Sequence, residues 1–281
     1  MELAYYPGCS LHSTGQEFDL SVQAVFSSLG IGLTELEDWS CCGASSAHAV
    51  DPAMAVLLPA RNLMLADRAG MDVLMPCAAC YNRHVVAGSH LREDPVLLAR
   101  AEALYGCSAE WRSRPRALLD VICQDLPRDE LMARVVRPLN GVPLVSYYGC
   151  LLLRPEAILQ SEDPENPVLM DELLSDLGAH ARRWSYAGEC CGGGLSLTRP
   201  TSVKRLVSRL VEAAREAGAE AIVTSCPLCE VNLEMRQGAG RMPVLYITEL
   251  LGIALGVSSS IWWKKHLIDP APLLRRHALV N

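Results

Sequence analysis

The apolar positions of the chain form short runs whose spacing alternates between that of strands and that of helices. In the N-terminal half the spacing predicts strands and helices in alternation: strands over 3–6, 31–36 and 73–75, and helices over 18–29 and 52–69. Gly30 and Gly70 directly follow the two helices, a position where glycine commonly ends a helix. Strands alternating with helices are typical of α/β folds with parallel sheets.

The C-terminal half repeats the same order. It is predicted to contain strands over 143–147, near 183–186 and over 221–224, and helices over 167–177 and 200–217. We therefore expect two similar open α/β halves that arose by internal duplication, residues 1–142 and 143–281. Residues 81–140 read as a mostly helical insert in the first half, with a linker near 135–143.

Composition narrows the class of protein. Half of the 281 residues are hydrophobic and 20% are charged, which excludes a disordered chain and allows a sizeable core. The net charge of −7 gives no overall basic face for nucleic acid. The first ten residues lack the basic and apolar regions of a signal peptide, and residues 245–257 are short for a membrane span and contain Glu249. We expect a cytoplasmic protein without membrane association.

Cysteine is the unusual component, with twelve residues in the chain. Ten of them form two sets of five: Cys9, Cys41, Cys42, Cys77 and Cys80, then Cys150, Cys190, Cys191, Cys226 and Cys229. In both sets 34 residues separate the adjacent pair from the CxxC motif, whereas 31 and 39 residues precede the pair. The flanking sequences also repeat, as YYPGC and YYGC and as CCGAS and CCGGG. This doubled pattern predicts two equivalent sites.

Each of these cysteines follows a predicted strand. The carboxyl ends of parallel strands meet at one crevice, so cysteines that are distant in sequence are expected to converge there. In a cytoplasmic chain, clustered thiols indicate metal or redox chemistry rather than disulfide bonds. Cys107 and Cys123 lie outside both sets and are interpreted as structural thiols.

The number of thiols limits what they hold. Structural zinc and a cubane iron–sulfur cluster each take four cysteines. Five thiols with an adjacent pair favour a polynuclear iron–sulfur site, and Gly43 and Gly192 after the pairs leave room for close backbone approach. Two alternatives stay open: one thiol of each set is free, or one half holds zinc.

With these motifs in view, the chain resembles the cysteine-rich CCG family, and most closely the B subunit of heterodisulfide reductase. The resemblance covers essentially the whole chain and rests on YYPGC, PCAACYN, YYGCLLLRP, CCGGG, CPLCEVN and WWKKHLIDP. It implies that each five-cysteine set holds one noncubane 4Fe–4S cluster. It also implies that a disulfide substrate lies between the two clusters, where it is reduced or, in reverse, formed.

The resemblance further implies two partners, the ferredoxin-like C subunit and the flavoprotein A subunit of such a reductase. The chain has neither a GxGxxG fingerprint nor a CxxCxxCxxxCP run, so we expect no flavin or NAD in it and electrons delivered by a partner. Two other functions stay open. One is an electron-transfer role for a thiol-carrier or quinone-linked partner, without cleavage of a disulfide by the chain itself; the other is an interaction module that holds zinc or iron.

Five further residues are weak candidates for catalysis. They follow the ligand loops at short range: His12, His48, His84, Arg83 and Arg154. The histidines could protonate a departing thiolate, and the arginines could hold an anionic disulfide or offset cluster charge. For each of them a hydrogen-bonded loop histidine or a solvated arginine stays an alternative. Residues 262–265 form an amphipathic tail, which we expect to pack on the protein or a partner rather than on a membrane.

Overall fold

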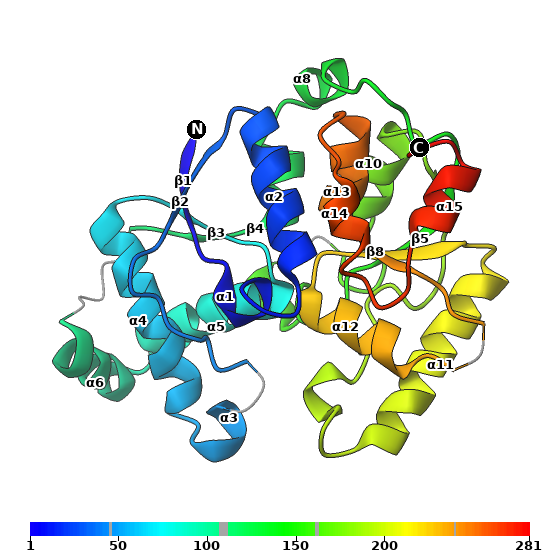
Figure 1. Ribbon diagram of the computed structural model, residues 1–281. Coiled ribbons are helices and arrows are strands. Elements are labelled where there is room, and N and C mark those ends of the chain that lie inside the picture. Colours follow the sequence, from blue (N-terminus) through cyan, green and yellow to red (C-terminus); the bar gives the residue numbers. More distant parts are fainter. Residues whose placement is uncertain (45–46, 107–111, 161–162, 239) are drawn as a thin grey trace.

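The structure is a computed structural model that describes residues 1–44, 47–106, 112–160, 163–238 and 240–281, leaving aside the side chains of residues 48 and 49. Two α/β halves lie side by side, the first drawn mainly in blue and cyan and the second in green to red (Figure 1). Each half contains one four-stranded sheet, so the predicted fold class is confirmed.

The first sheet is parallel throughout and has the order β2-β1-β3-β4. Its strands are β1 (Glu2–Tyr5), β2 (Gly32–Glu35), β3 (Val73–Met75) and β4 (Pro115–Ala117). The helices that connect them are α1 (Gly8–Leu11), α2 (Gln16–Ser28), α3 (Ala47–Val50) and α4 (Met54–Ala69). Leu74 and Met75 of β3 are completely buried, as expected for a central strand covered on both faces.

The second sheet repeats this arrangement in the order β6-β5-β7-β8, again all parallel. Its strands are β5 (Pro143–Tyr147), β6 (His180–Ala181), β7 (Ala221–Thr224) and β8 (Val244–Tyr246). The helical elements are α9 (Glu156–Leu159), α10 (Leu169–Asp176), η2 (Gly193–Leu195), α11 (Pro200–Glu216), α12 (Pro227–Arg236), α13 (Ile247–Ala254), α14 (Ser260–Trp263) and α15 (Ala271–Arg276). The matching strand order confirms the duplication, while a division of the chain at residue 142 stays a prediction.

The insert is largely helical, as predicted. Besides β4, it contains α5 (Ala78–Glu93), α6 (Pro95–Tyr105), α7 (Leu118–Asp120), the π-helix η1 (Val121–Asp125) and α8 (Arg128–Ala133). The strand β4 was not predicted because only Ala117 of its three residues is fully buried, so it carries no apolar alternation.

The prediction of a strand near 183–186 is wrong, because the segment that pairs with β5 is His180–Ala181. Trp184 produced the misleading pattern. Its indole packs against the core, and its Nε1 donates a 2.8 Å hydrogen bond to the carbonyl of Ser146 instead of extending the sheet.

Helix α2 joins the two halves. Figure 1 places this helix of the first half beside α13 and α14 of the second, and these elements are in contact. Phe18 stacks on Tyr246 with ring centroids 4.2 Å apart, and the hydroxyls of Ser21 and Thr248 lie 2.7 Å apart. All four residues are buried, so the halves share one continuous core.

The tail after α13 packs on the protein. Trp262 and Trp263 are 3% and 6% exposed, and their rings meet edge to face at 5.7 Å. The Trp262 ring approaches Gly252 of α13 so closely that a side chain there would collide with it. The prediction of a packed tail is therefore confirmed.

Candidate metal centre

The loops that follow the strands carry the first set of cysteines. Cys9 lies in the short helix α1 after β1, and Cys41 and Cys42 lie in the loop after β2. Cys77 is the N-cap residue of α5 directly after β3, and Cys80 lies in the first turn of that helix. The parallel strands thus bring residues from three loops to one edge of the sheet.

The sulfur atoms of this first set lie close together. The Sγ atoms of Cys42 and Cys80 are 3.4 Å apart, and those of Cys9 and Cys41 are 3.9 Å apart. Two thiolates bound about 2.3 Å from one tetrahedral metal lie about 3.8 Å apart. The paired thiols are therefore close enough to share a metal. Cys42, Cys77 and Cys80 are buried, whereas Cys9 and Cys41 are exposed.

The second set repeats this geometry. The Sγ atoms of Cys191 and Cys229 lie 3.6 Å apart, and Cys226 is the N-cap residue of α12. All five cysteines of this set line one cavity of about 50 Å³, to which Ala78 of the first half also contributes. A small cavity lined by five sulfur-bearing side chains is suited to a compact inorganic group.

Hydrogen bonding within the sets lowers the pKa of one thiol of a pair and raises the pKa of its partner. The neighbouring Cys41 and Cys80 lower the pKa of Cys42, and the neighbouring Cys150 lowers the pKa of Cys190 to about 6. The backbone N–H of Gly192 donates to Cys190 Sγ at 3.3 Å. In the first set, the backbone N–H of Gly43 donates to Cys41 Sγ at 3.4 Å. Because the thiolate is the form that binds metal, these donors fit an iron–sulfur site.

The two sets meet at the boundary between the halves. Hydrogen bonding with Cys226 raises the pKa of Cys77, and the same contact helps to lower the pKa of Cys226. Both residues are buried N-caps of equivalent helices, α5 and α12. Groups bound to the two sets would therefore be neighbours.

Two glycines explain how the backbone comes so near to the sulfur atoms. Gly8 and Gly149 each precede a cysteine of the sets and each have φ of +67°. A Cβ at Gly8 would lie 2.9 Å from Cys80 Sγ, and one at Gly149 would lie 3.2 Å from Cys229 Sγ. Any larger residue would therefore push against a sulfur atom at an equivalent place in each half.

Equivalent tyrosines hold the loops of the adjacent cysteine pairs. The hydroxyl of Tyr6 donates to the carbonyl of Ser40 at 2.8 Å, and that of Tyr147 donates to the carbonyl of Glu189 at 2.6 Å. In both halves the accepting residue directly precedes the pair. The repeated tyrosines of YYPGC and YYGC were the signal for this role, which was not predicted from the sequence.

Tyr147→Phe is expected to lower the free energy of unfolding by about 1 kcal/mol and to weaken metal retention in the second set, since one hydrogen bond to the loop is lost. Denaturant unfolding and metal analysis would measure both effects. Tyr186→Phe is the matched control, because its hydroxyl accepts only an exposed bond from Arg209 at 3.1 Å. Equal metal loss in both variants would show that Tyr147 does not position the loop.

Asparagines support the same loops and were missed in the sequence. The side-chain amide of Asn62 exchanges hydrogen bonds with the backbone of Ser40, and that of Asn232 donates to the carbonyl of Cys191 at 2.7 Å. Asn82 reaches across the halves and donates to the carbonyls of Leu151 and Arg154. Asn82 and Asn232 end the motifs PCAACYN and CPLCEVN, so the sequence held a signal for these two asparagines but none for Asn62.

His84 is fully buried and has both ring nitrogens engaged. Its Nδ1 lies 2.7 Å from the carbonyl of Cys80, and its Nε2 lies 3.1 Å from the amide of Asn62. Burial lowers its pKa, so the ring is neutral. His12 differs, with a side chain 48% exposed and 3.4 Å from Glu35. The side chain of His48 lies outside the described residues.

The arginine candidates and the two remaining cysteines lie in different surroundings. Arg154 is exposed and pairs with Glu165, whereas the Nε of Arg83 is buried with no partner among the described residues. Cys123 lies in η1, where burial raises its pKa to about 12. Cys107 lies outside the described residues. The eleven cysteines described are all free thiols.

Fold and site together define a duplicated α/β protein that gathers five thiols at the carboxyl edge of each sheet. The model of the family "CCG: Cysteine-rich domain" matches residues 3–83 and 144–234. The chain belongs to this family of cysteine-rich proteins, which implies an iron–sulfur protein similar to the B subunit of heterodisulfide reductase.

Similar proteins carry related names. The chain is 34% identical to the 8-methylmenaquinol:fumarate reductase membrane anchor subunit of Wolinella succinogenes, over 97% of this chain and 99% of that protein. It is 27% identical to the B subunit of the ferredoxin:CoB-CoM heterodisulfide reductase of Methanosarcina mazei, over 92% and 90%. A protein of Archaeoglobus profundus named as similar to the heterodisulfide reductase B subunit is 28% identical over 89% of both chains.

A solved structure shares the fold. The crystal structure of a hypothetical protein from Helicobacter pylori superposes with a TM-score of 0.73 at 12% identity. The match covers 93% of this chain but 50% of that one, so this chain spans half the length of the solved protein. In the part of the chain that the structure describes, no helix has the length and apolar character needed to cross a bilayer.

Proposed function

We propose that the chain is the catalytic iron–sulfur subunit of a heterodisulfide reductase-like complex, an oxidoreductase acting on a sulfur group. In this proposal each five-cysteine set holds one noncubane 4Fe–4S cluster, and a disulfide is reduced or formed between them. The observation that carries the proposal is that the two sets meet at the boundary between the halves: Ala78, which directly follows Cys77, lines the cavity of the second set together with Cys226, which would bring two redox groups to one place.

The chemistry of a disulfide explains why two sites would be needed. Splitting an S–S bond into two thiols takes two electrons and two protons, and iron–sulfur clusters would supply the electrons singly. The cysteines would hold the clusters, while Tyr6 and Tyr147 fix the loops of the adjacent pairs. His12 is our candidate proton donor, because its side chain is half exposed and it lies three residues after Cys9 in the sequence. Arg83 is our candidate for binding an anionic group of the substrate.

A larger cavity adjoins the second set and offers space for an organic substrate. It has a volume of about 780 Å³ and is lined from both halves, by Tyr81, Leu119 and Asp120 of the first and by Tyr148, Leu152 and Asp163 of the second. Tyr148 also lines the small cavity of the second set. The two cavities therefore share Tyr148 as a lining residue.

We further propose that partners deliver the electrons, namely a ferredoxin-like C subunit and a flavoprotein A subunit. The relatives from Methanosarcina are named as B subunits, which supports membership of such a complex. A second function is favoured by the 34% identical relative, which is named as the membrane anchor subunit of an 8-methylmenaquinol:fumarate reductase. In that case the chain would pass electrons between a quinone-linked partner and the rest of its complex without cleaving a disulfide.

Metal analysis and electron paramagnetic resonance test these proposals together. Two clusters predict about eight irons and matching sulfide per chain, whereas zinc without sulfide would contradict both redox functions. Adding a candidate disulfide to the oxidised complex is expected to change the cluster signals. Unchanged signals with every disulfide tried, together with electron transfer from a menaquinol, would favour the electron-transfer function instead.

A further inference from the structure

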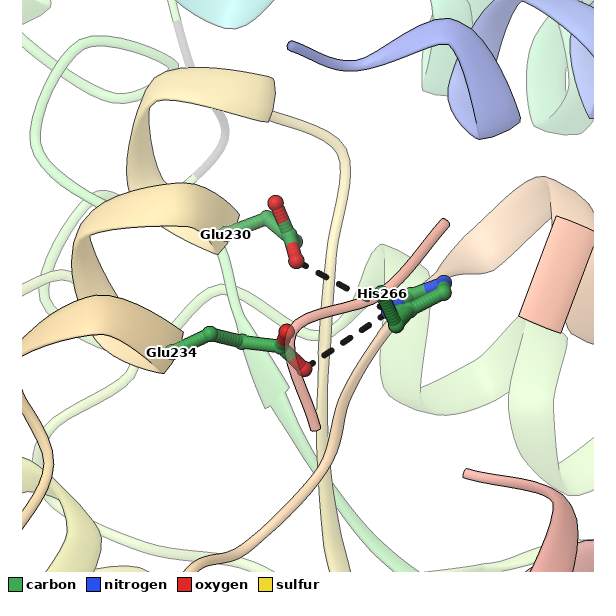
Figure 2. A group of neighbouring side chains, drawn as sticks. All are labelled: Glu230, Glu234 and His266. Carbon is green, nitrogen blue, oxygen red and sulfur yellow. Dashed lines mark ion pairs between the residues drawn. The ribbon is translucent and has the colours of Figure 1, made fainter. Parts of the chain in front are cut away.

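Two buried glutamates of α12 and one buried histidine that follows α14 form a group outside the two cysteine sets. Glu230 and Glu234 are one turn apart on this helix and face His266, which follows α14 (Figure 2). The side chains of Glu234 and His266 are 0% exposed and that of Glu230 is 4% exposed. One ligand atom from each residue lies within 4.8 Å of the others.

The imidazole of His266 directs an unused nitrogen at the two glutamates. Its Nε2 lies 2.9 Å from a carboxylate oxygen of Glu249, which can only accept, so Nε2 carries the proton of the neutral ring. In the neutral ring Nδ1 would present its lone pair toward Glu230 and Glu234, at 3.7 Å and 3.6 Å. These distances exceed those of N–H···O hydrogen bonds, and Nδ1 has no hydrogen-bond partner among the described residues.

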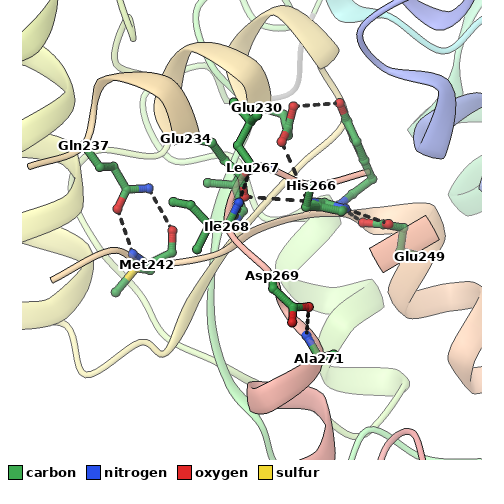
Figure 3. A network of polar contacts seen from close by, with 12 residues as sticks. Glu230, Glu234, Gln237, Met242, Glu249, His266, Leu267, Ile268, Asp269 and Ala271 are labelled. Carbon is green, nitrogen blue, oxygen red and sulfur yellow. Dashed lines mark hydrogen bonds and ion pairs between the residues drawn. The ribbon is translucent and has the colours of Figure 1, made fainter. Parts of the chain in front are cut away.

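Other contacts fix both carboxylates in place (Figure 3). Glu234 accepts hydrogen bonds from the backbone N–H groups of Leu267 at 2.7 Å, Ile268 at 2.9 Å and Val244 at 3.2 Å. One oxygen of Glu230 accepts from the hydroxyl of Tyr246 at 3.2 Å, and its other oxygen faces Nδ1. Several contacts therefore hold the arrangement, with carboxylate oxygens and a ring nitrogen directed at one point.

The charges of this group favour a positive charge at its centre. Carboxylate oxygens of Glu230, Glu234 and Glu249 lie 3.7, 3.6 and 2.9 Å from the ring nitrogens of His266. Buried charges in proteins are paired or coordinate metals, and a divalent cation at this point would offset the negative charge of the carboxylates.

We propose that Glu230, Glu234 and His266 bind one divalent transition-metal ion of the Zn²⁺ or Mn²⁺ class. Nitrogen and carboxylate ligands about 2.0–2.2 Å from one such ion lie roughly 3–4 Å apart. The distances from Nδ1 of His266 to the two glutamates are in this range, at 3.7 Å and 3.6 Å. A ligating histidine usually donates its other ring N–H to a carboxylate, as His266 does to Glu249. Imidazole and carboxylate together suit these ions, while the thiols of the two sets suit softer ones.

The bound ion would tie the tail to the helix that carries part of the second cysteine set. Glu230 directly follows Cys229 on α12, and His266 lies in the segment between α14 and α15. The ion would hold these segments together and stabilise the start of α12. This structural role does not depend on what the thiols bind, so it stands apart from the proposed function.

The test uses the full chain with its clusters loaded, stripped of loosely bound metal and titrated with Mn²⁺ alone, because thiolates bind Mn²⁺ poorly. One Mn²⁺ per chain is expected, with a nitrogen coupling from one imidazole in pulsed electron paramagnetic resonance. Glu234→Gln and His266→Gln are each expected to weaken this binding at least tenfold. Glu220→Gln is the matched control, because Glu220 also pairs with a histidine of the tail, His277, and should leave binding unchanged.

Several results would overturn the metal site. One is the absence of bound Mn²⁺ in the parent chain, which would mean that protons neutralise the group. Another is bound Mn²⁺ that shows no nitrogen coupling. Equal binding by His266→Gln would place the ion elsewhere. If the variants fold poorly, anomalous diffraction from Mn²⁺ in the parent protein decides the question. Iron content measured in the same samples separates failure of this site from failure of the cysteine sites.

Discussion

Cys191→Ser is expected to remove iron from the second cysteine set alone and to leave about half of the iron of the parent chain, about four irons per chain. Cys191 is buried with its sulfur 3.6 Å from that of Cys229, and it lines the small cavity of that set. A serine hydroxyl is a hard, weakly acidic ligand that replaces a thiolate poorly. Iron and sulfide analysis of the purified chain measures the loss.

Cys42→Ser is the equivalent change in the first set, where the sulfur of Cys42 lies 3.4 Å from that of Cys80. It should also leave about half of the iron, and the double variant should retain almost none. Cys123→Ser is the control, since Cys123 lies in η1 outside both sets and should keep the iron of the parent chain. Unchanged iron in either single variant would mean that its set holds zinc or nothing.

Loss of all iron in a single variant would have a different meaning. Cys77 and Cys226 interact across the boundary between the halves, so damage to one set could release the other. The single variants therefore also measure how strongly the two sites depend on each other. Independent loss is the expected result, because each set takes all of its cysteines from its own half.

The strands and helices that were predicted have an apolar pattern of their own, although β8, which is equally apolar and buried, was not predicted. Residues 73–75, 143–147 and 221–224 are apolar runs that form central strands, and the long helix near 200–217 carries a regular buried face. By contrast, β4 and β6 have few buried residues, and pairing with a neighbouring strand decides their conformation. This pairing leaves no local pattern in the sequence from which the two strands could be predicted.

The same distinction applies to the site. The ten cysteines could be found because their spacing repeats in one sequence. The contact between Cys77 and Cys226 could not, because it depends on how the two halves are placed against each other. Nor could the group at His266 be predicted, since its carboxylates belong to α12 and α13 and no repeat singles them out.

The placement of the halves therefore matters for the proposed function, and α2 is a helix that helps to fix it. This helix contributes Phe18 and Ser21 to contacts with the residues that open α13, at the end of the strand next to β7. The loop after β7 carries Cys226. Removing one of the stacked rings is thus expected to lower the stability of the chain and to affect the place where the two cysteine sets meet.

Phe18→Ala is accordingly expected to lower the free energy of unfolding by about 3–5 kcal/mol, because it leaves a cavity at a fully buried ring. Denaturant unfolding of the chain measures the change. Combining it with Tyr246→Leu should reveal a coupling of about 0.5–1.5 kcal/mol, as for other aromatic pairs. Phe26→Ala is the control: Phe26 is equally buried on α2 but lies outside this stack, so its effect should add to that of Tyr246→Leu. Additivity of Phe18→Ala with Tyr246→Leu would show that the rings do not hold the halves together.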